Sequence, residues 1–370
     1  MTTITADSLF FRLLRLSMDE TSPWAEDVAA APEDWERSFA EARRQAVSGV
    51  LWRGVTQMNP ASMLRNAKLT WYADAQRVQI ANERNAKAAV AIAHYVESCG
   101  FCTCLLKGQA SAARYPDPGL RTSGDVDLWL WPSEGWSRPE RSLAFIKQQW
   151  PNARVTYCHA EIGDVGGVPV ELHIRPTYRN NPLHNRRLQK WMFRQAACHG
   201  TETIAIGGNE ARINVLPDMA DRIYLLSHIA THVVQEGIGL RQIMDYYCLL
   251  RHGCTEDERA AAEHLLRRFG LRTMAGAVMW VLHETMALPN EKMLVPMDER
   301  RGRFLMDEIW RGGNFGQHDA DVPTFERQTA VGRNWRRLRR DIRLVSLFPS
   351  EALCEPLFRT WHFFWRVCHK

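Results

Sequence analysis

Residues 105–131, LLKGQASAARYPDPGLRTSGDVDLWLW, contain the pattern that decides the fold of this chain. They predict a strand ending at Lys107-Gly108, a short helix, a loop rich in proline and glycine, and a second strand carrying Asp125 and Asp127. Successive side chains of a strand point to opposite faces, so the two aspartates share one face. Neighbouring carboxylates repel each other unless a cation lies between them. Because Mg²⁺ binds carboxylate oxygens together with substrate phosphates, this pattern predicts metal-assisted phosphoryl or nucleotidyl transfer.

A third carboxylate follows in residues 168–174, VPVELHI. Apolar side chains take one face of this predicted strand, and Glu171 and His173 take the other. If the strand pairs in matching register with the strand of the two aspartates, Glu171 lies beside both of them. Three acids can hold two metal ions about 3.5–4 Å apart. His173 would then contact the metal site or the substrate, or else be an ordinary half-buried histidine.

These motifs, together with HIATHVV and GLRQIMDYYCLL further on, resemble an uncharacterised nucleotidyltransferase family. The family is labelled NTP transferase 5 and is similar to the polymerase-beta-like nucleotidyltransferases. The order of elements matches it over roughly residues 8–350. The resemblance implies that Asp125, Asp127 and Glu171 are the catalytic and metal-binding residues. It also implies Mg²⁺ or Mn²⁺ as the cofactor and an NTP as a substrate.

The same resemblance implies a phosphate-binding role for Lys107 and Gly108. Gly108 would open the first helix of the core, where backbone N–H groups attract anions and glycine permits their close approach. The superfamily has Gly-Ser or Gly-Gly where this chain has Lys107-Gly108, so one hydroxyl contact is absent. Lys107 is expected to compensate as a point charge on phosphate. The alternative is a lysine that extends from the end of an apolar strand to the surface.

Two arginines are further candidates for nucleotide binding. Arg121 precedes the aspartates in a loop, where it would neutralise triphosphate charge, hold the aspartates by a bidentate contact, or be an ordinary loop arginine. Arg241 resembles a residue of the family's C-terminal helical element that faces the nucleotide cleft. Its alternative is a local salt bridge with Asp245, four residues further along the same helix.

The predicted elements indicate an α+β fold with a small mixed-sheet nucleotidyltransferase core between two helical regions. We divide the chain into an N-terminal helical region (1–99), the core (100–216) and a C-terminal helical region (217–370). The core strands are predicted at 101–106, 124–131, 153–161, 168–174, 202–206 and 211–215, with helices at 108–114 and 138–150. Further helical patterns cover 33–58, 61–98, 218–235, 240–251, 255–286, 330–347 and 350–367.

Composition gives weaker signals. The 47 basic and 42 acidic residues leave a net charge of +5, so nucleic acid is a possible partner that is not favoured. The N-terminus has no cleavable signal pattern, and no apolar run reaches about eighteen residues, so we expect no transmembrane segment. The nine cysteines are scattered, which favours reduced thiols and a cytoplasmic location. The Cys158-His159 pair lacks a CxxC spacing and indicates a thiol rather than a zinc ligand.

The segment 332–343, GRNWRRLRRDIR, is strongly basic. Trp335, Leu338, Ile342 and Val345 fall on one stripe of the helix predicted there. Such a helix can bind RNA or an anionic membrane surface. More often it buries the apolar stripe against its own domain and leaves the arginines in solvent, and this is the arrangement we expect.

The preferred prediction is a metal-dependent nucleotidyltransferase that moves an NMP from an NTP to a hydroxyl acceptor and releases pyrophosphate. The acceptor would lie on a small molecule, a peptide or a protein. One alternative is a non-catalytic nucleotide-binding or adaptor protein on the same fold, against which the complete set of three acids argues. Another is an RNA-directed nucleotidyltransferase, whose binding would depend strongly on salt. The acceptor, the preferred NTP and the oligomeric state have no readable motif.

Overall fold

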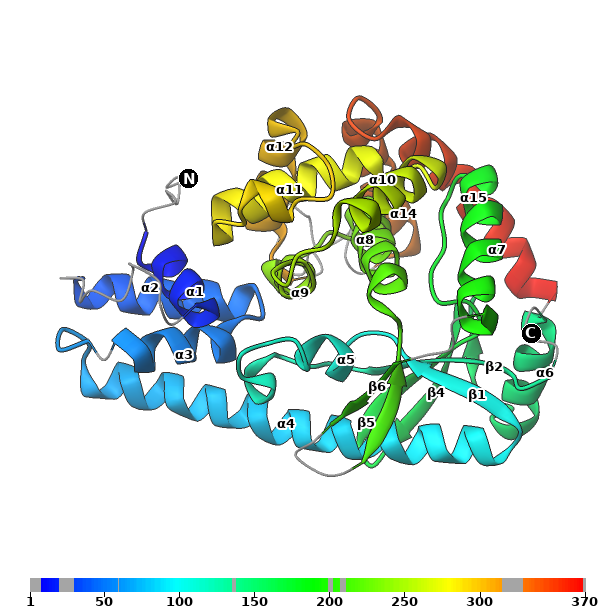
Figure 1. Ribbon diagram of the computed structural model, residues 1–370, viewed down its shortest axis with the longest axis horizontal. Helices are drawn as coiled ribbons and strands as arrows, with labels where there is room; N and C mark the ends of the chain where they lie inside the picture. The colour runs from blue at the N-terminus through cyan, green and yellow to red at the C-terminus, as the bar shows by residue number, and fades with distance from the viewer. Residues whose placement is uncertain are drawn as a thin grey trace.

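The computed structural model describes residues 8–19, 30–58, 60–134, 138–198, 202–206, 211–314 and 329–368. Within these residues, seven strands form one mixed sheet in the order β3-β4-β5-β2-β1-β7-β6 (Figure 1). The strands are β1 (Phe101–Leu105), β2 (Val126–Pro132), β3 (Arg154–Val155), β4 (His159–Val165), β5 (Val168–His173), β6 (Glu202–Ala205) and β7 (Arg212–Val215). Helices lie on either side of the sheet, which confirms the predicted α+β class.

The centre of the sheet is β2, the strand of the Asp-x-Asp motif. It pairs antiparallel with β1 and parallel with β5. The β2–β5 register places Asp127 opposite Glu171 and Trp129 opposite His173. Because both strands alternate in phase, their polar side chains point to the same face of the sheet.

The prediction of one strand over residues 153–161 is wrong, because the chain reverses direction in the middle of this segment. β3 ends at Val155, and β4 begins at His159 and pairs antiparallel with β3. The hydroxyl of Thr156 accepts hydrogen bonds from the backbone N–H groups of Cys158 (3.3 Å) and His159 (3.1 Å). A threonine side chain that satisfies its own neighbouring backbone stabilises a tight turn in place of an extended strand.

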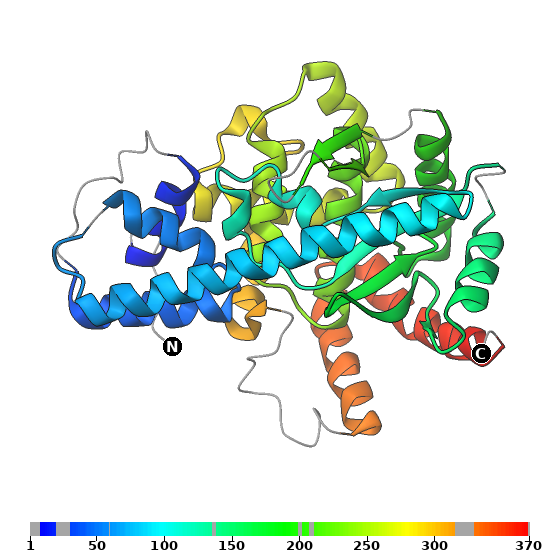
Figure 2. The same cartoon turned by 90° about the horizontal axis from the view of Figure 1, so that it is seen from below.

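The two faces of the sheet belong to different cores. The even-numbered side chains of β2, Val126, Leu128 and Leu130, pack with α4 (Arg65–Ser98) and α6 (Pro139–Gln149). Figure 2 shows α4 running across this face. Trp129 and Trp131 point the other way and join a cluster that includes side chains of α7 (Pro182–Cys198) and α8 (Asp218–Gln235). The face that carries the acids is therefore covered by the C-terminal helices.

The N-terminal helices pack against helices from the far end of the chain. They are α1 (Leu9–Met18), α2 (Pro32–Arg44) and α3 (Ser48–Met58). The Arg15 guanidinium donates to the Glu284 carbonyl at 2.7 Å and to the Thr285 carbonyl at 3.2 Å. Phe10 and Phe11 each have ring centroids 5.5 Å from that of Trp310. The boundaries at 99 and 216 stay a prediction.

The remaining helices lie along the acid-bearing side of the molecule. They are the short α5 (Gln109–Ala112), then α9 (Leu240–Leu250), α10 (Glu256–Arg268), α11 (Arg272–Met286), α12 (Glu299–Gly312), α14 (Ala330–Val345) and α15 (Pro349–Cys368), with 3₁₀ turns η2 (Pro118–Leu120) and η3 (Asn290–Lys292). The sequence patterns do not predict α7 or α12. None of the described helices is long and apolar enough to cross a membrane.

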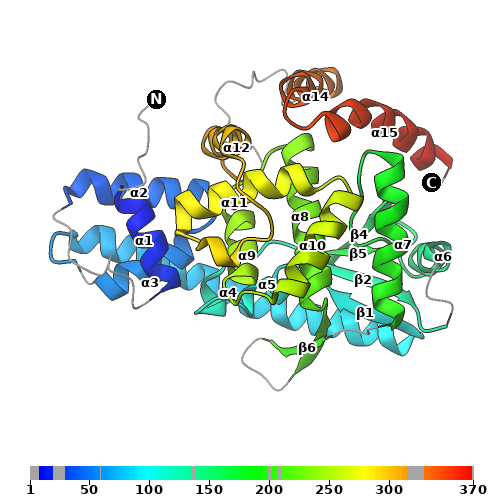
Figure 3. The same cartoon turned by 45° about the horizontal axis from the view of Figure 1, so that its top comes forward.

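The orientation expected for the basic helix is wrong. In α14, Trp335, Leu338 and Ile342 are 51%, 37% and 66% exposed, whereas Arg340 and Asp341 are buried. The Arg340 guanidinium lies 3.4 Å from a carboxylate oxygen of Glu308 on α12. Figure 3 shows α14 and α15 on the side of the molecule remote from α4. The buried side of α14 thus carries an interhelical ion pair, and three of the four residues of the apolar stripe are in solvent, whereas Val345 packs against the core.

Candidate functional site

The site begins with three carboxylates on neighbouring strands. Asp125 directly precedes β2, Asp127 lies within it, and Glu171 lies opposite Asp127 on β5. One carboxylate oxygen from each of the three lies within 4.8 Å of the others. Asp127 is buried, whereas Asp125 and Glu171 are half-buried. The structure therefore brings together the three acids that the strand patterns predict to be neighbours.

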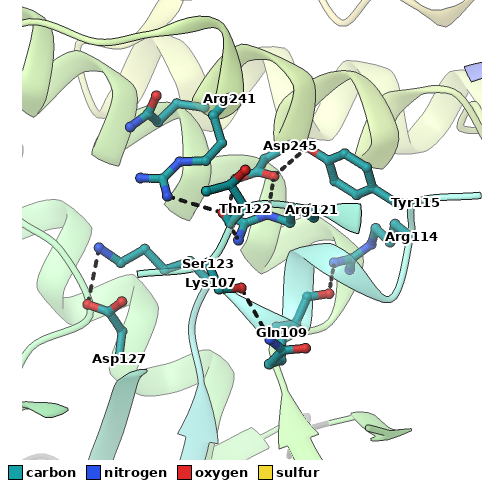
Figure 4. A network of polar contacts seen from close by, with 12 residues as sticks. Lys107, Gln109, Arg114, Tyr115, Arg121, Thr122, Ser123, Asp127, Arg241 and Asp245 are labelled. Carbon is teal, nitrogen blue, oxygen red and sulfur yellow. Dashed lines mark hydrogen bonds and ion pairs between the residues drawn. The ribbon is translucent and has the colours of Figure 1, made fainter. Parts of the chain in front are cut away.

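Asp127 is the buried centre of this group. Its Oδ1 lies 3.2 Å from Nζ of Lys107 and 2.9 Å from Nε2 of His173 (Figure 4 shows the lysine contact). Its Oδ2 is buried and has no hydrogen-bond partner among the described residues. A buried carboxylate oxygen without a partner is costly. This oxygen is consequently available to a ligand.

Lys107 stands at the end of β1 and points to the acids rather than to solvent. Burial lowers the pKa of Lys107, but the charges of Asp127, Asp125 and Glu171 outweigh it and raise the pKa above its usual value. The ammonium group is therefore protonated throughout the physiological range. Its side chain is 16% exposed, so the charge is also within reach of a ligand.

Glu171 stays ionised because of its basic neighbours. Burial raises the pKa of Glu171, but the His173 hydrogen bond and the charges of His159, His173 and Lys107 outweigh it and lower the pKa to about 2. His159 Nδ1 and His173 Nε2 each lie 3.5 Å from Oε2 of Glu171. Burial lowers the pKa of His173, but hydrogen bonds to Asp127, Cys158 and Glu171 raise it well above 6.5.

A stability measurement can test the lowered pKa of Glu171. Ionised Glu171 contributes stability that is present above about pH 4.5 and is lost as the pH falls toward about 2. Glu171→Gln removes this contribution. The free energy of unfolding of the metal-free wild type should therefore exceed that of the variant at neutral pH, and the difference should shrink in acid. Urea denaturation at several pH values measures it, and a difference that does not change with pH would contradict the assignment.

Arg121 does not contact Asp125 or Asp127. Its guanidinium forms a bidentate pair with Asp245 on α9, with distances of 2.7 and 2.6 Å (Figure 4). Tyr115 donates its hydroxyl to the same carboxylate at 2.7 Å. Burial and the charge of Asp245 raise the pKa of Tyr115, so its hydroxyl remains a donor. Asp245 on α9 thus holds the loop that precedes Asp125 against the C-terminal helices.

Arg241 and Gly108 line one cavity with Lys107 and the two aspartates. Arg241 donates to the Thr122 carbonyl at 3.1 Å, in the loop that also holds Arg121. Gly108 precedes α5 with a φ of +64°. The wall of this cavity therefore combines cationic side chains, a glycine and the two aspartates.

Gly108→Ala should destabilise the protein by about 1–2 kcal/mol, because L-residues rarely adopt a positive φ. Gly124→Ala is the matched control. Residue 124 does not have a positive φ, and a Cβ added there meets no atom within 4 Å. Chemical denaturation of both variants measures the two costs. Equal stabilities would show that the backbone at Gly108 does not require glycine.

A protein-family model described as "uncharacterised nucleotidyltransferase" matches residues 31–287, more than half of the 370-residue chain. The chain belongs to this family. The family inferred from the motifs is thereby confirmed, and with it membership of a family of transferases. None of the curated proteins matches the chain. Among solved structures, it is similar to an antigenic nucleotidyltransferase-like protein from Paracoccidioides brasiliensis, with 14% identity and a TM-score of 0.30 over 50% of this chain and 88% of that one.

The residues of this family member fit a divalent cation of the kind that nucleotidyltransferases typically use. Hard cations prefer carboxylate oxygens, and the three carboxylates supply ligand atoms within 4.8 Å of one another. The oxygen of Asp127 that lacks a hydrogen bond gives an independent reason, because a cation would satisfy it. Asp125, Asp127 and Glu171 are thus the residues that would hold the ion.

His159 is not among the predicted site residues, because residues 153–161 are predicted to form a single strand. The turn at Thr156 begins a new strand at His159, so the alternation of side chains between the two faces starts again there. His159 therefore pairs with His173 in the β4–β5 ladder. Cys158, just before it, is a buried thiol 3.9 Å from Nδ1 of His173. Burial raises the pKa of Cys158, but hydrogen bonds to His159 and His173 outweigh it and lower the pKa to about 7. Thr156 is a signal in the sequence that indicates a turn at this point.

Proposed function

We propose that this protein is a Mg²⁺- or Mn²⁺-dependent enzyme that transfers an NMP from an NTP to an acceptor hydroxyl and releases pyrophosphate. One observation carries the proposal. The carboxylates lie between two spaces, a cavity with the cationic Lys107 and Arg241 in its wall and an open groove of about 760 Å³. Asp125 lines both spaces, so a group held there would contact ligands on either side.

The wall of the cavity suits the phosphates of the NTP, but its volume of about 20 Å³ is that of a water-sized group, so the cavity must widen before a phosphate enters. Lys107 and Arg241 supply positive charge, and Gly108 lets a phosphate approach the backbone closely. Arg121 also lines this cavity, but its guanidinium is held by Asp245. We therefore assign phosphate binding to Lys107 and Arg241, and we assign to Arg121 the positioning of the loop that precedes Asp125.

The groove on the other side suits the acceptor. Asp125 and Glu171 form part of its wall, together with Trp150 and residues of β4. Its openness to solvent allows a bulky acceptor to place one hydroxyl beside the carboxylates. Peptides, proteins and small molecules that carry a hydroxyl all fit this requirement.

The reaction follows from this arrangement. An oxygen of the acceptor attacks the α-phosphorus in line, the bond from that phosphorus to the β-phosphate oxygen breaks, and pyrophosphate leaves. Lys107 stabilises the charge that develops on the leaving group. A bound divalent ion supplies Lewis acidity and lowers the pKa of the acceptor hydroxyl.

The carboxylates differ in their capacity to take the acceptor's proton. The lowered pKa of Glu171 makes it a weaker proton acceptor than an ordinary glutamate. Its carboxylate is therefore better suited to hold a cation than to act as the general base. Asp127 accepts two contacts on Oδ1 and is buried. Asp125, half-buried and on the border of the groove, is the carboxylate best placed to receive the proton.

The proposal is tested by a transfer assay. Purified protein is incubated with Mg²⁺ or Mn²⁺ and each α-labelled NTP, with and without cell extract, beside the Asp125→Asn/Asp127→Asn double variant. Label that moves to a product only with the intact protein supports nucleotidyl transfer, and mass spectrometry of that product identifies the acceptor. Metal-dependent NTP binding without any transfer would favour the non-catalytic alternative. Neither binding nor transfer would show that the three acids do not form a nucleotide site.

A further inference from the structure

A second group of potential metal ligands adjoins the three carboxylates. It consists of His159, Glu171 and His173, whose ligand atoms all lie within 4.8 Å of one another. Nδ1 of His159 and Nε2 of His173 are each 3.5 Å from the same oxygen of Glu171, Oε2. Two nitrogens therefore converge on a carboxylate that the Asp125–Asp127 pair also faces.

The sheet holds these three side chains in place. His159 and His173 are direct partners in the antiparallel β4–β5 ladder, and Glu171 lies two residues before His173 on the same face of β5. The imidazole ring centroids of His159 and His173 are 5.1 Å apart. Ligands carried on paired strands are preorganised, so little conformational entropy is lost when an ion binds.

The second nitrogen of His173 is also arranged as in metal sites. Its Nδ1 lies 3.3 Å from the Arg175 carbonyl oxygen. A carbonyl only accepts hydrogen bonds, so Nδ1 carries a hydrogen and Nε2 is the atom turned to the carboxylates. In the metal-free protein Nε2 donates to Oδ1 of Asp127 at 2.9 Å, so an ion that binds Nε2 replaces that proton. Histidines that bind metals typically donate their other N–H to a backbone carbonyl or a carboxylate, which orients the ring.

The distances match a small coordination sphere. Nitrogen and oxygen ligands that lie about 2.1 Å from an ion at tetrahedral angles are about 3.4 Å from each other. The two nitrogen-to-Oε2 distances of 3.5 Å are close to this value. The third distance, between the two nitrogens, is within 4.8 Å.

We propose that His159, Glu171 and His173 bind a divalent transition-metal ion such as Mn²⁺, Co²⁺ or Zn²⁺. Imidazole nitrogen favours these ions over Mg²⁺, which prefers oxygen. Glu171 belongs to this group and also to the three carboxylates. The inference rests on the proposed function only through this shared residue. The protein would thus have a mixed nitrogen–oxygen metal centre beside the three carboxylates, with Glu171 also in the wall of the open groove.

The first test is spectroscopic and needs no substrate. Full-length protein is loaded with Mn²⁺ alone, and pulsed EPR is used to detect coupling of the ion to ¹⁴N. We expect nitrogen coupling in the wild type and in His94→Gln, which alters an exposed histidine of α4. His159→Gln should reduce it. Mn²⁺ that binds without any nitrogen coupling would overturn the inference and leave the carboxylate site intact.

A second measurement separates ligation from a structural role. Co²⁺ binding is followed by its visible absorption in the wild type, His159→Gln, His173→Gln and His94→Gln. Loss of a ligand should weaken binding more than about 10-fold and change the absorption bands. His159 contacts Glu171, so His159→Gln removes a ligand without a change at Asp127. Unchanged Co²⁺ binding and spectra in both variants would contradict the inference. Absence of any metal binding in the wild type would count against both this site and the proposed function.

Discussion

Asp127→Asn is expected to lower kcat/KM for nucleotidyl transfer on the order of 1000-fold, which corresponds to about 4 kcal/mol of transition-state stabilisation. Asparagine keeps the size and shape of the side chain but removes its charge. Asp127 is 1% exposed and lies at the meeting point of Lys107, His173 and the other two acids. Its charge therefore acts in a region of low dielectric, where the loss of one charge is felt strongly.

The measurement is the rate of α-label transfer at low NTP concentration, with saturating divalent metal. Asp307→Asn makes the same chemical change at an exposed position of α12 and should leave the rate unchanged. Circular dichroism shows whether the variant is folded. A folded Asp127→Asn protein within about threefold of the wild-type rate would rule out an essential role for this carboxylate.

Asp245→Ala is expected to reduce the free energy of unfolding by about 3–5 kcal/mol, because it leaves the buried Arg121 guanidinium without its bidentate partner. Both side chains of the pair are 5% exposed. The Tyr115 hydroxyl loses the same acceptor. Breaking a buried pair by removing one partner is costly because the remaining charge cannot regain its hydration.

Urea denaturation measures this loss. Glu299→Ala is the matched control, since Glu299 pairs with Arg303 on the surface of α12 with both side chains about two-thirds exposed. That change should cost less than about 1 kcal/mol. Replacing the buried pair together, as Arg121→Met/Asp245→Leu, should recover part of the stability lost in Asp245→Ala. A cost below about 1 kcal/mol for Asp245→Ala would show that water reaches Arg121.

The Asp245 pair also shows how far local sequence patterns extend. The i, i+4 spacing of Arg241 and Asp245 suggests a salt bridge within one helix. In the fold, Asp245 forms a bidentate pair with Arg121, 124 residues away, and Arg241 donates to the neighbouring Thr122 carbonyl. A helix pattern shows which residues share a face, but it does not show which distant loop packs on that face.

The orientation of α14 has the same explanation. Its periodicity predicts the helix but not the direction of its faces, because Glu308 lies on α12, an element that the sequence patterns do not predict. The turn at Thr156 is a smaller case, in which a side-chain hydrogen bond to the backbone outweighs the strand propensity of the segment. His159 enters the site only through that turn.

Features that depend on local periodicity can be predicted from the amino-acid sequence. Alternation along β2 and β5 placed Asp125 and Asp127 on one face and Glu171 on the polar face of its own strand, and the motifs sufficed to recognise the nucleotidyltransferase family. The tertiary structure decided the register that joins Glu171 to Asp127, the pairing of Arg121 with Asp245 and the approach of His159. The physical reason is that strand register and long-range ion pairs depend on how separate elements pack, and side-chain periodicity contains no information about the partner.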